Sequence, residues 1–467
     1  MDIEEQVDTD SSREAVRRAI AQMDELDDTL RAVITRLDDE ALEQARRCDE
    51  ARARDESLGP LHGWTLALKD NIATAGVLTT SGSRFFQDHV PDADAFVTER
   101  LKRAGAILTA KVNLAEFALG ATTHNDHWGT CRNAWDPERI PGGSSGGSAV
   151  AVAADMARTS LGTDTGGSVR IPAAVNGLVG IRPTLGRISN RGVTPISAAF
   201  DTVGPLARTA EEVAQVFAVI DVYDPEDPTC LDHERSSVLA ELATPLDGLR
   251  VGVPRRFFFD DLDPGVEKLL REFIGVLERL GCQVTDVDLR QADQAQRHMF
   301  NILYPDAAAF HAERVVENPE LFGPEVLDRL RLGEGVDAKD MSASLTWRRG
   351  WQRRVERIFE QVDVIVTPTL PGDVPLVQHG GMIATTHTIT RFTYPWAMFG
   401  GPSLAVPCGF HEKSGLPVGA HLTSAPWHDH TVLRTAHQYQ QVTDFHRSVT
   451  PLVRRGGFLG PDDKKVG

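Results

Sequence analysis

Apolar residues follow two different spacings in this sequence. Over 16–30 they recur every three or four positions, which predicts an amphipathic helix, and Ser11 followed by Glu14 fits a helix-capping box. A second stretch of the same kind follows the first. We therefore expect residues 1–62 to form a helical N-terminal arm that packs on one large domain over 63–467.

Beyond the arm, short apolar runs alternate with stretches of helical periodicity. A run at 64–70 is followed by a helical stretch near 94–104 and by a second run at 106–112. This alternation predicts an α/β fold with a largely buried sheet. Residues 292–360 are expected to be mostly helical. The further expected elements are strands at 249–254, 283–289, 363–369, 403–410 and 415–422, the last two as a hairpin, and helices near 264–280 and 429–441.

The composition excludes several classes of protein. The 467 residues include 49 Lys and Arg against 67 Asp and Glu, a formal net charge of −18. Nucleic-acid binding requires clustered cations, so we expect no nucleic-acid partner. The acidic N-terminus lacks the features of a signal peptide, and no apolar run reaches the roughly 18 residues of a membrane span. The five cysteines form no metal-binding or disulfide pattern. We therefore expect a cytoplasmic protein with no membrane partner, no metal and no cofactor.

Two short runs rich in glycine and serine contain the candidate chemistry. PGGSSGGSA spans 141–149 and GTDTGGSVRIP spans 162–172. A flexible linker is the usual meaning of such composition, but these runs are short and bounded by ordered sequence. A glycine-rich turn at a helix N-terminus gathers backbone N–H groups that attract negative charge. Neither GxxxxGK[ST] nor a strand followed by GxGxxG occurs, so the pattern favours an oxyanion hole over a phosphate site.

An oxyanion hole needs a nucleophile beside it, and Ser168 closes the second run directly after two glycines. The N–H groups from Thr165 to Ser168 would then face a developing oxyanion. A serine also needs a base. None of the 15 histidines lies in a pattern that singles it out, and no GxSxG elbow occurs. Lys69 is the available base, although a lysine that extends to solvent from the rim of a sheet would have the same pattern.

These segments resemble the amidase signature family. GGSSGGS, GTDTGGSVRIPA and the upstream ALKDN are its hallmarks, and 75 residues separate Lys69 from Ser144 while 24 separate Ser144 from Ser168, as in the family. Counterparts of family segments run along nearly the whole chain, from NLAEFALG to the C-terminal GLPVGAHL. The resemblance implies a single large α/β domain with a mixed central β-sheet covered by helices.

The resemblance also implies the catalytic roles. Ser168 would be the acylated nucleophile, Ser144 a bridging serine after a cis peptide bond, and Lys69 the base that acts through Ser144. Lys69 must be neutral to accept a proton, so burial has to lower its pKa from about 10.4. The remaining implied roles are an oxyanion hole formed by Thr165, Gly166 and Gly167, and support by Ser145, Asp164 and Arg170.

The substrate is less constrained than the reaction. We expect hydrolysis of a carboxamide C–N bond of a small molecule through a seryl acyl-enzyme, with release of ammonia or an amine. One branch of the family, the amidase subunit of a tRNA-dependent amidotransferase, releases ammonia from glutamine and typically has glutamine where this chain has Ile171. We therefore expect a stand-alone amidase with an apolar or aromatic acyl group, similar to aryl and indole acetamide hydrolases. The alternative is membership of the amidotransferase branch.

The residues that could line an apolar pocket could equally pack in the core. They are Phe117, Leu119, His124, Trp128, Ile171, Phe392, Tyr394 and Trp396. A homodimer is compatible with this prediction. Two other classes of function are disfavoured: a non-catalytic scaffold protein, because Lys69, Ser144 and Ser168 are all present, and a nucleotide-binding protein, because no P-loop pattern occurs.

Overall fold

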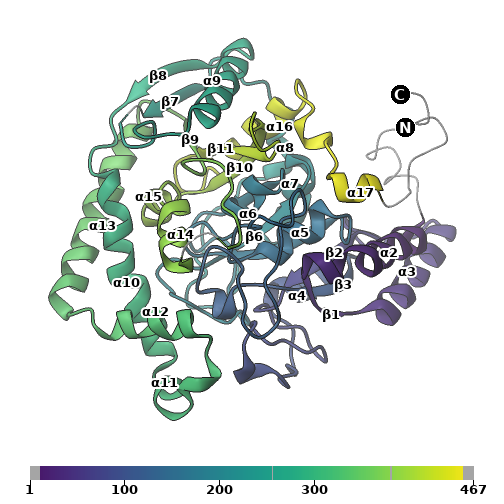
Figure 1. The fold of residues 1–467 in the computed structure, drawn as a ribbon. Coiled ribbons are helices and arrows are strands. Elements are labelled where there is room, and N and C mark those ends of the chain that lie inside the picture. Colours follow the sequence, from purple (N-terminus) through teal and green to yellow (C-terminus); the bar gives the residue numbers. More distant parts are fainter. Residues whose placement is uncertain (1–10, 255, 379–380, 456–467) are drawn as a thin grey trace.

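The computed structural model describes residues 11–455 except 255 and 379–380. One sheet of 11 strands crosses the molecule in the order β1-β3-β2-β4-β6-β5-β10-β11-β9-β7-β8, with helices around it (Figure 1). Parallel and antiparallel neighbours both occur, which confirms the predicted α/β fold with a mixed sheet. The strands are β1 (Val33–Arg36), β2 (Thr65–Lys69), β3 (Ile107–Val112), β4 (Thr159–Asp164), β5 (Val179–Arg182), β6 (Thr202–Ala207), β7 (Arg250–Pro254), β8 (Gln283–Val287), β9 (Val364–Pro368), β10 (Ser403–Phe410) and β11 (Pro417–Thr423).

The strand that ends in Lys69 lies between two parallel neighbours. β2 pairs in parallel with β3 on one side and with β4 on the other. Every residue of these three strands is buried, which explains why the β2 and β3 segments read as near-continuous apolar runs. β10 and β11 form the predicted antiparallel hairpin. Because β2 and β4 run in the same direction, their carboxyl ends lie at the same edge of the sheet.

The helices follow the predicted periodicity closely. The Ser11–Glu14 capping box is present at the start of the first described helix. The predicted helical region after residue 292 contains four α-helices. The helices are α2 (Ser12–Leu30), α3 (Asp38–Ala53), α4 (Phe96–Arg103), α5 (Gly146–Ala153), α6 (Arg170–Val175), α7 (Ala210–Ile220), α8 (Val238–Glu241), α9 (Pro264–Arg279), α10 (Ala295–Phe310), α11 (Ala312–Glu317), α12 (Pro324–Glu334), α13 (Ala338–Phe359), α14 (Met382–Ile389), α15 (Tyr394–Phe399), α16 (Asp429–Gln440) and α17 (Pro451–Arg455).

A short strand that the sequence pattern did not predict lies between α2 and α3. β1 pairs antiparallel with β3 and forms one edge of the sheet. Its four residues are only partly buried, so their apolar pattern is weak. The boundary at residue 62 between an arm and a main domain stays a prediction. The sequence GPDDKKVG at 460–467 is expected to be a frayed tail, and it lies outside the described residues.

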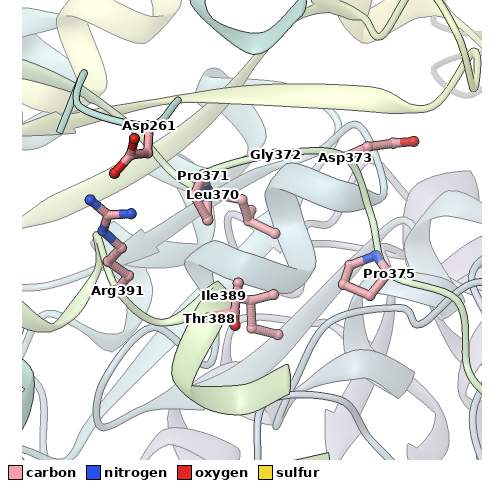
Figure 2. Close-up of a pocket in the computed structure, with 9 residues that line it drawn as sticks. All are labelled: Asp261, Leu370, Pro371, Gly372, Asp373, Pro375, Thr388, Ile389 and Arg391. Atoms are coloured by element: carbon pink, nitrogen blue, oxygen red, sulfur yellow. The ribbon is translucent and has the colours of Figure 1, made fainter. Parts of the chain in front are cut away.

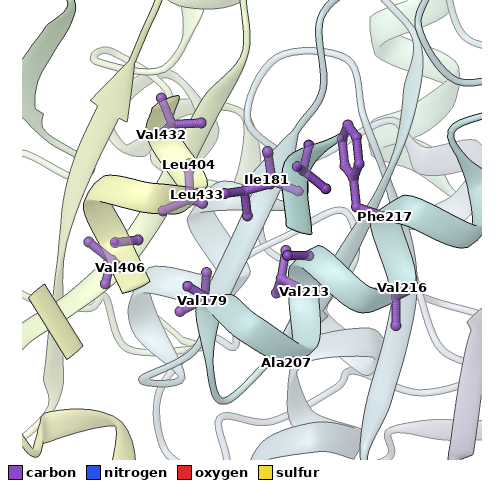
Figure 3. Packing of buried hydrophobic residues seen from close by; sticks show 14 of the residues in the cluster. Val179, Ile181, Ala207, Val213, Val216, Phe217, Leu404, Val406, Val432 and Leu433 are labelled. Carbon is purple, nitrogen blue, oxygen red and sulfur yellow. The ribbon is translucent and has the colours of Figure 1, made fainter. Parts of the chain in front are cut away.

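A large hydrophobic cluster fills the space between the sheet and two of the helices that cover it. Val179 of β5 and Leu404 of β10 face Val213 and Phe217 of α7 and Leu433 of α16, and all five side chains are fully buried (Figure 3). Burying a side chain of this size stabilises a fold by about 1.5–3 kcal/mol. The cluster therefore holds α7 and α16 against the sheet.

The green helices α10 to α13 lie together at one side of the sheet (Figure 1). α10 packs against both α12 and α13, and α15 packs against α10 and α13. This group of helices supplies part of the pocket described below. Among the described residues, no helix is both long enough and apolar enough to cross a membrane.

Candidate active site

Three segments bring an amine and two hydroxyl groups to the same edge of the sheet. Lys69 is the last residue of β2, Ser144 lies two residues before α5, and Ser168 lies in the turn between β4 and α6. The Ser145 N–H donates to the Ser168 carbonyl at 3.2 Å, so the two glycine-rich runs lie side by side. The three residues that the sequence selected as a triad therefore belong to one site.

The Lys69 amine is held by two hydroxyl groups. Its Nζ lies 2.7 Å from Ser144 Oγ and 2.7 Å from Thr163 Oγ1, and the Asn71 side-chain amide also donates to Thr163 Oγ1 at 3.2 Å. Lys69 and Ser144 are both fully buried, and the Gly143–Ser144 peptide bond is cis. The side chain does not extend to solvent, which removes the alternative that the sequence left open for Lys69.

Burial lowers the pKa of Lys69 from 10.5 to about 7, while the carboxylates of Asp164 and Asp201 act in the opposite direction. Desolvation therefore makes the neutral amine available near neutral pH. Hydroxyl partners stabilise this amine without adding a negative charge that would keep it protonated. In this state Lys69 can accept a proton from Ser144.

The turn after β4 approaches its neighbours so closely that side chains would not fit. A Cβ at Gly166 would collide with the ring of Tyr394, and Gly167 has a φ of +141°. The N–H of Gly167 donates to Asp164 Oδ1 at 2.8 Å and is thus occupied. The N–H groups of Thr165, Gly166 and Ser168 have no acceptor among the described residues and are the donors that an oxyanion could use.

A buried carboxylate fixes this turn on both sides. Asp164 accepts the Gly167 N–H at 2.8 Å and the Val169 N–H at 3.1 Å, and its two oxygens lie 2.9 and 3.0 Å from the guanidinium of Arg170. Burial raises its pKa, but Arg170 and Arg182 outweigh that effect and hold the pKa well below the ordinary value. Asp164 therefore stays ionised and positions the backbone around Ser168.

Two further residues support the site and were missed by sequence reasoning. Thr163 is the second partner of Lys69, and the Ser145 hydroxyl donates to its carbonyl at 3.2 Å. Asp201 accepts the Thr165 hydroxyl at 2.6 Å, and burial raises its pKa. The sequence could have indicated Thr163, because residues two positions apart in a strand point to the same face and Thr163 lies two positions before Thr165. Nothing local marks Asp201, which lies in the segment DTVGPLART.

A small cavity of about 30 Å³ opens onto the site. Ser168 is half-buried, and its hydroxyl makes no hydrogen bond to any described residue. The lining combines backbone, hydroxyl groups, apolar side chains and one arginine. It consists of Ala118, Leu119, Gly120, Ala121, Thr165, Gly166, Ser168, Ile196, Leu303, Tyr304, Arg329, Thr386, Thr390 and Tyr394.

A larger cavity of about 380 Å³ lies beside the segment 388–391, which also contributes Thr390 to the small cavity. Figure 2 shows Asp261 and Arg391 on one side, Pro375 on the other, and Leu370 and Ile389 between them. None of Lys69, Ser144 or Ser168 lines it. Ser168 lines the small cavity instead, so the small cavity is the candidate substrate site in spite of its size.

The family model described as Amidase matches residues 14–433. This chain belongs to the amidase family. The amidase is 38% identical over 462 residues to a subunit of the glutamyl-tRNA(Gln) amidotransferase of Moorella thermoacetica, with 94% of each chain covered. It is likewise 38% identical over 466 residues to the corresponding protein of Chloroflexus aurantiacus, with 94% of this chain and 95% of the relative covered.

Solved structures agree with this assignment. A protein of a vestigial complex that reveals the origins of an s-triazine catabolic enzyme has a TM-score of 0.87 to this amidase and 32% identity, over 92% of this chain and 95% of the other. The peptide amidase of Stenotrophomonas maltophilia has a TM-score of 0.78 and 30% identity, over 93% and 94%. The amidase is thus an amidase signature hydrolase that acts on amide C–N bonds. The curated relatives favour the alternative of an amidotransferase component over the stand-alone enzyme that the sequence pattern favoured.

The candidate pocket residues of the amidase divide into two groups. Leu119 and Tyr394 line the small cavity. Phe117, Phe392 and Trp396 pack in the hydrophobic core, and Ile171 is fully buried in α6. The two remaining candidates do not line the cavity either: His124 pairs with Asp126 at 3.0 Å, and Trp128 is half-buried. Sequence reasoning missed Tyr304, Arg329, Thr386 and Thr390, which come from α10, α12, α14 and the residue after α14.

Proposed function

We propose that this amidase hydrolyses the primary amide of a small acyl group and releases ammonia, with Ser168 as nucleophile and Lys69 as base. The observation that carries the proposal is the buried contact of 2.7 Å between the Lys69 amine and the Ser144 hydroxyl, at a site where Ser168 lines a cavity. An amine whose pKa is lowered to about 7 by burial suits proton transfer near neutral pH.

The reaction divides into two half-reactions. Ser168 Oγ attacks the carbonyl carbon while its proton passes to Ser144, whose own proton passes to Lys69. The resulting oxyanion accepts hydrogen bonds from the N–H groups of Thr165, Gly166 and Ser168. Return of the proton to the amide nitrogen breaks the C–N bond, releases ammonia and leaves an acyl ester on Ser168. Water then attacks this ester by the same proton path, which releases the carboxylic acid and restores the serine.

The cavity supports a small, partly polar acyl group. Its lining combines hydroxyl groups and the guanidinium of Arg329 with apolar side chains. These polar groups in the lining favour a polar acyl chain over the apolar or aromatic acyl group that the sequence predicted.

A second candidate function follows from the curated relatives. As the amidase component of a tRNA-dependent amidotransferase, the chain would release ammonia from glutamine in a complex with partner subunits. The relatives at 38% identity support this function. Ile171, in place of the glutamine typical of that branch, counts against it.

An ammonia-release assay tests the proposal. The purified chain should release ammonia from at least one short primary amide, and added hydroxylamine should divert the acyl-enzyme to a hydroxamate. Ser168→Ala should release none, while Ser414→Ala, a half-exposed serine far from the triad in sequence, serves as the matched control. A chain that is inactive alone but releases ammonia from glutamine once partner subunits are present would establish the second function. Full activity of Ser168→Ala would refute both.

A further inference from the structure

Arg329 is the one arginine among the described residues that line the small cavity. It lies on α12, and its side chain is 4% exposed. Its Nε is buried and makes no hydrogen bond. Ser168, Thr165 and Gly166 line the same cavity, so the guanidinium shares the cavity with the nucleophile.

The contacts of Arg329 hold its guanidinium in place, but none of them is a close contact with a carboxylate. Its terminal nitrogens donate to the carbonyls of Leu119 and Glu325 at 3.3 and 3.4 Å and to the Thr386 hydroxyl at 3.4 Å. These distances are long for charged donors, which prefer about 2.7–2.9 Å. The nearest carboxylate oxygen belongs to Glu325, at 3.6 Å, and the Glu325 side chain is 33% exposed. A second anion on the cavity side would complete the coordination of this buried cation.

The rest of the lining is uncharged. Tyr304 also contacts Arg329, and Thr386, Thr390 and Tyr394 add hydroxyl groups. No aspartate or glutamate is among the described residues of the lining. The cavity therefore offers a strong partner for a carboxylate but no ion-pair partner for an ammonium group.

We infer that the substrate carries a carboxylate that Arg329 binds, at the far end of the acyl chain from the scissile amide, and no ammonium group. This substrate class is the monoamide of a short dicarboxylic acid, such as succinamate or glutaramate. The inference rests on the proposed function, because it requires the acyl group to reach Ser168. A planar guanidinium and a carboxylate form parallel hydrogen bonds that fix both position and orientation. Because Ser168 and Arg329 line one cavity, the chain between the two ends has to be short.

Substrate analogues test the inference on the wild-type enzyme. The kcat/KM for glutaramate should exceed that for its neutral isostere glutardiamide, counted per amide, by about 100-fold, because loss of the charged partner leaves a buried group unpaired. Glutaramate should also be a better substrate than glutamine, which differs by the added ammonium. Equal rates on glutaramate and glutardiamide would overturn the inference and leave the proposed function standing. A clear preference for glutamine would overturn the part that excludes an ammonium group.

A variant pair adds an independent readout. In Arg329→Met the ratio of kcat/KM for glutaramate over glutardiamide should fall to near one, with most of the loss in KM. Arg331→Met, at an exposed arginine of the same helix, is the matched control and should keep the wild-type ratio. An unchanged ratio in Arg329→Met would contradict the assignment. If Arg329→Met does not fold, the comparison of analogues on the wild-type enzyme still decides. Failure of every amide to react would refute the proposed function itself.

Discussion

Replacing Lys69 by methionine should abolish hydrolysis and at the same time stabilise the fold at neutral pH. The buried amine has a pKa of about 7 in the folded chain, against 10.5 when it is exposed. The unfolded chain therefore binds a proton that the folded chain releases between these two values. At pH 7 this difference costs the folded state roughly 4–5 kcal/mol, and the cost declines as the pH rises towards 10.5.

Methionine removes this cost but also removes two hydrogen bonds. Thr163 keeps the Asn71 amide as a partner, so its loss is about 1 kcal/mol. Ser144 is left with a buried hydroxyl that lacks its amine partner, which costs about 1–2 kcal/mol. The net gain in the free energy of unfolding is then roughly 2 kcal/mol at pH 7, and it should vanish near pH 9.

Urea unfolding followed by circular dichroism at pH 7 and pH 9 measures this gain. Lys268→Met, at an exposed position of α9, is the control and should show no gain that depends on pH. A Lys69→Met protein that is less stable than the wild type at pH 7 would refute the reasoning. So would a gain of the same size at both pH values, because the effect would then not arise from titration of the buried amine.

Three further predictions concern the triad and its support. The pH–rate profile of the wild type should rise with an apparent pKa near 7 and level off on the alkaline side, since burial gives Lys69 that pKa and only the neutral amine acts as base; a flat profile from pH 5 to 9 would exclude Lys69 from the rate-limiting step. Lys69→Arg should lose at least about 1,000-fold in kcat, because guanidinium stays protonated; near-wild-type turnover would contradict a proton-accepting role. Asp164→Asn should lower the free energy of unfolding by about 3–5 kcal/mol in a urea titration, because it leaves Arg170 and Arg182 buried without their carboxylate, whereas Asp28→Asn, at an exposed position of α2, should change it little.

The residues of the candidate triad could be located from the sequence because the pattern that marks each of them is local. Ser144 and Ser168 lie in turns that are marked by the glycines next to them in the sequence. Lys69 is marked by its place at the end of an apolar run. The strands were predictable for a related reason, since a buried strand needs apolar residues on both faces. β1 was not, because its four residues, three half-buried and one exposed, give too short a pattern.

The pocket could not be predicted because its walls come from distant parts of the chain. Arg329 lies 161 residues after Ser168, on a helix whose sequence resembles any amphipathic helix with an arginine. Only the packing of α10 against α12 brings it to the cavity. For the aromatic residues the prediction was wrong. Trp396 and Phe117 are of a type that often lines binding pockets, but they pack in the hydrophobic core, which large apolar side chains favour equally.

Covalent labelling tests the central claim that Ser168 is the activated nucleophile. The wild-type chain is treated with a serine-directed fluorophosphonate at pH 8, digested and analysed by mass spectrometry, with Ser168→Ala and Lys69→Met treated in parallel. We predict one adduct, on the peptide that contains Ser168, with no adduct in Ser168→Ala and much slower labelling in Lys69→Met. An adduct on Ser144 or on any other serine, formed at the wild-type rate in the Ser168→Ala protein, would contradict this claim.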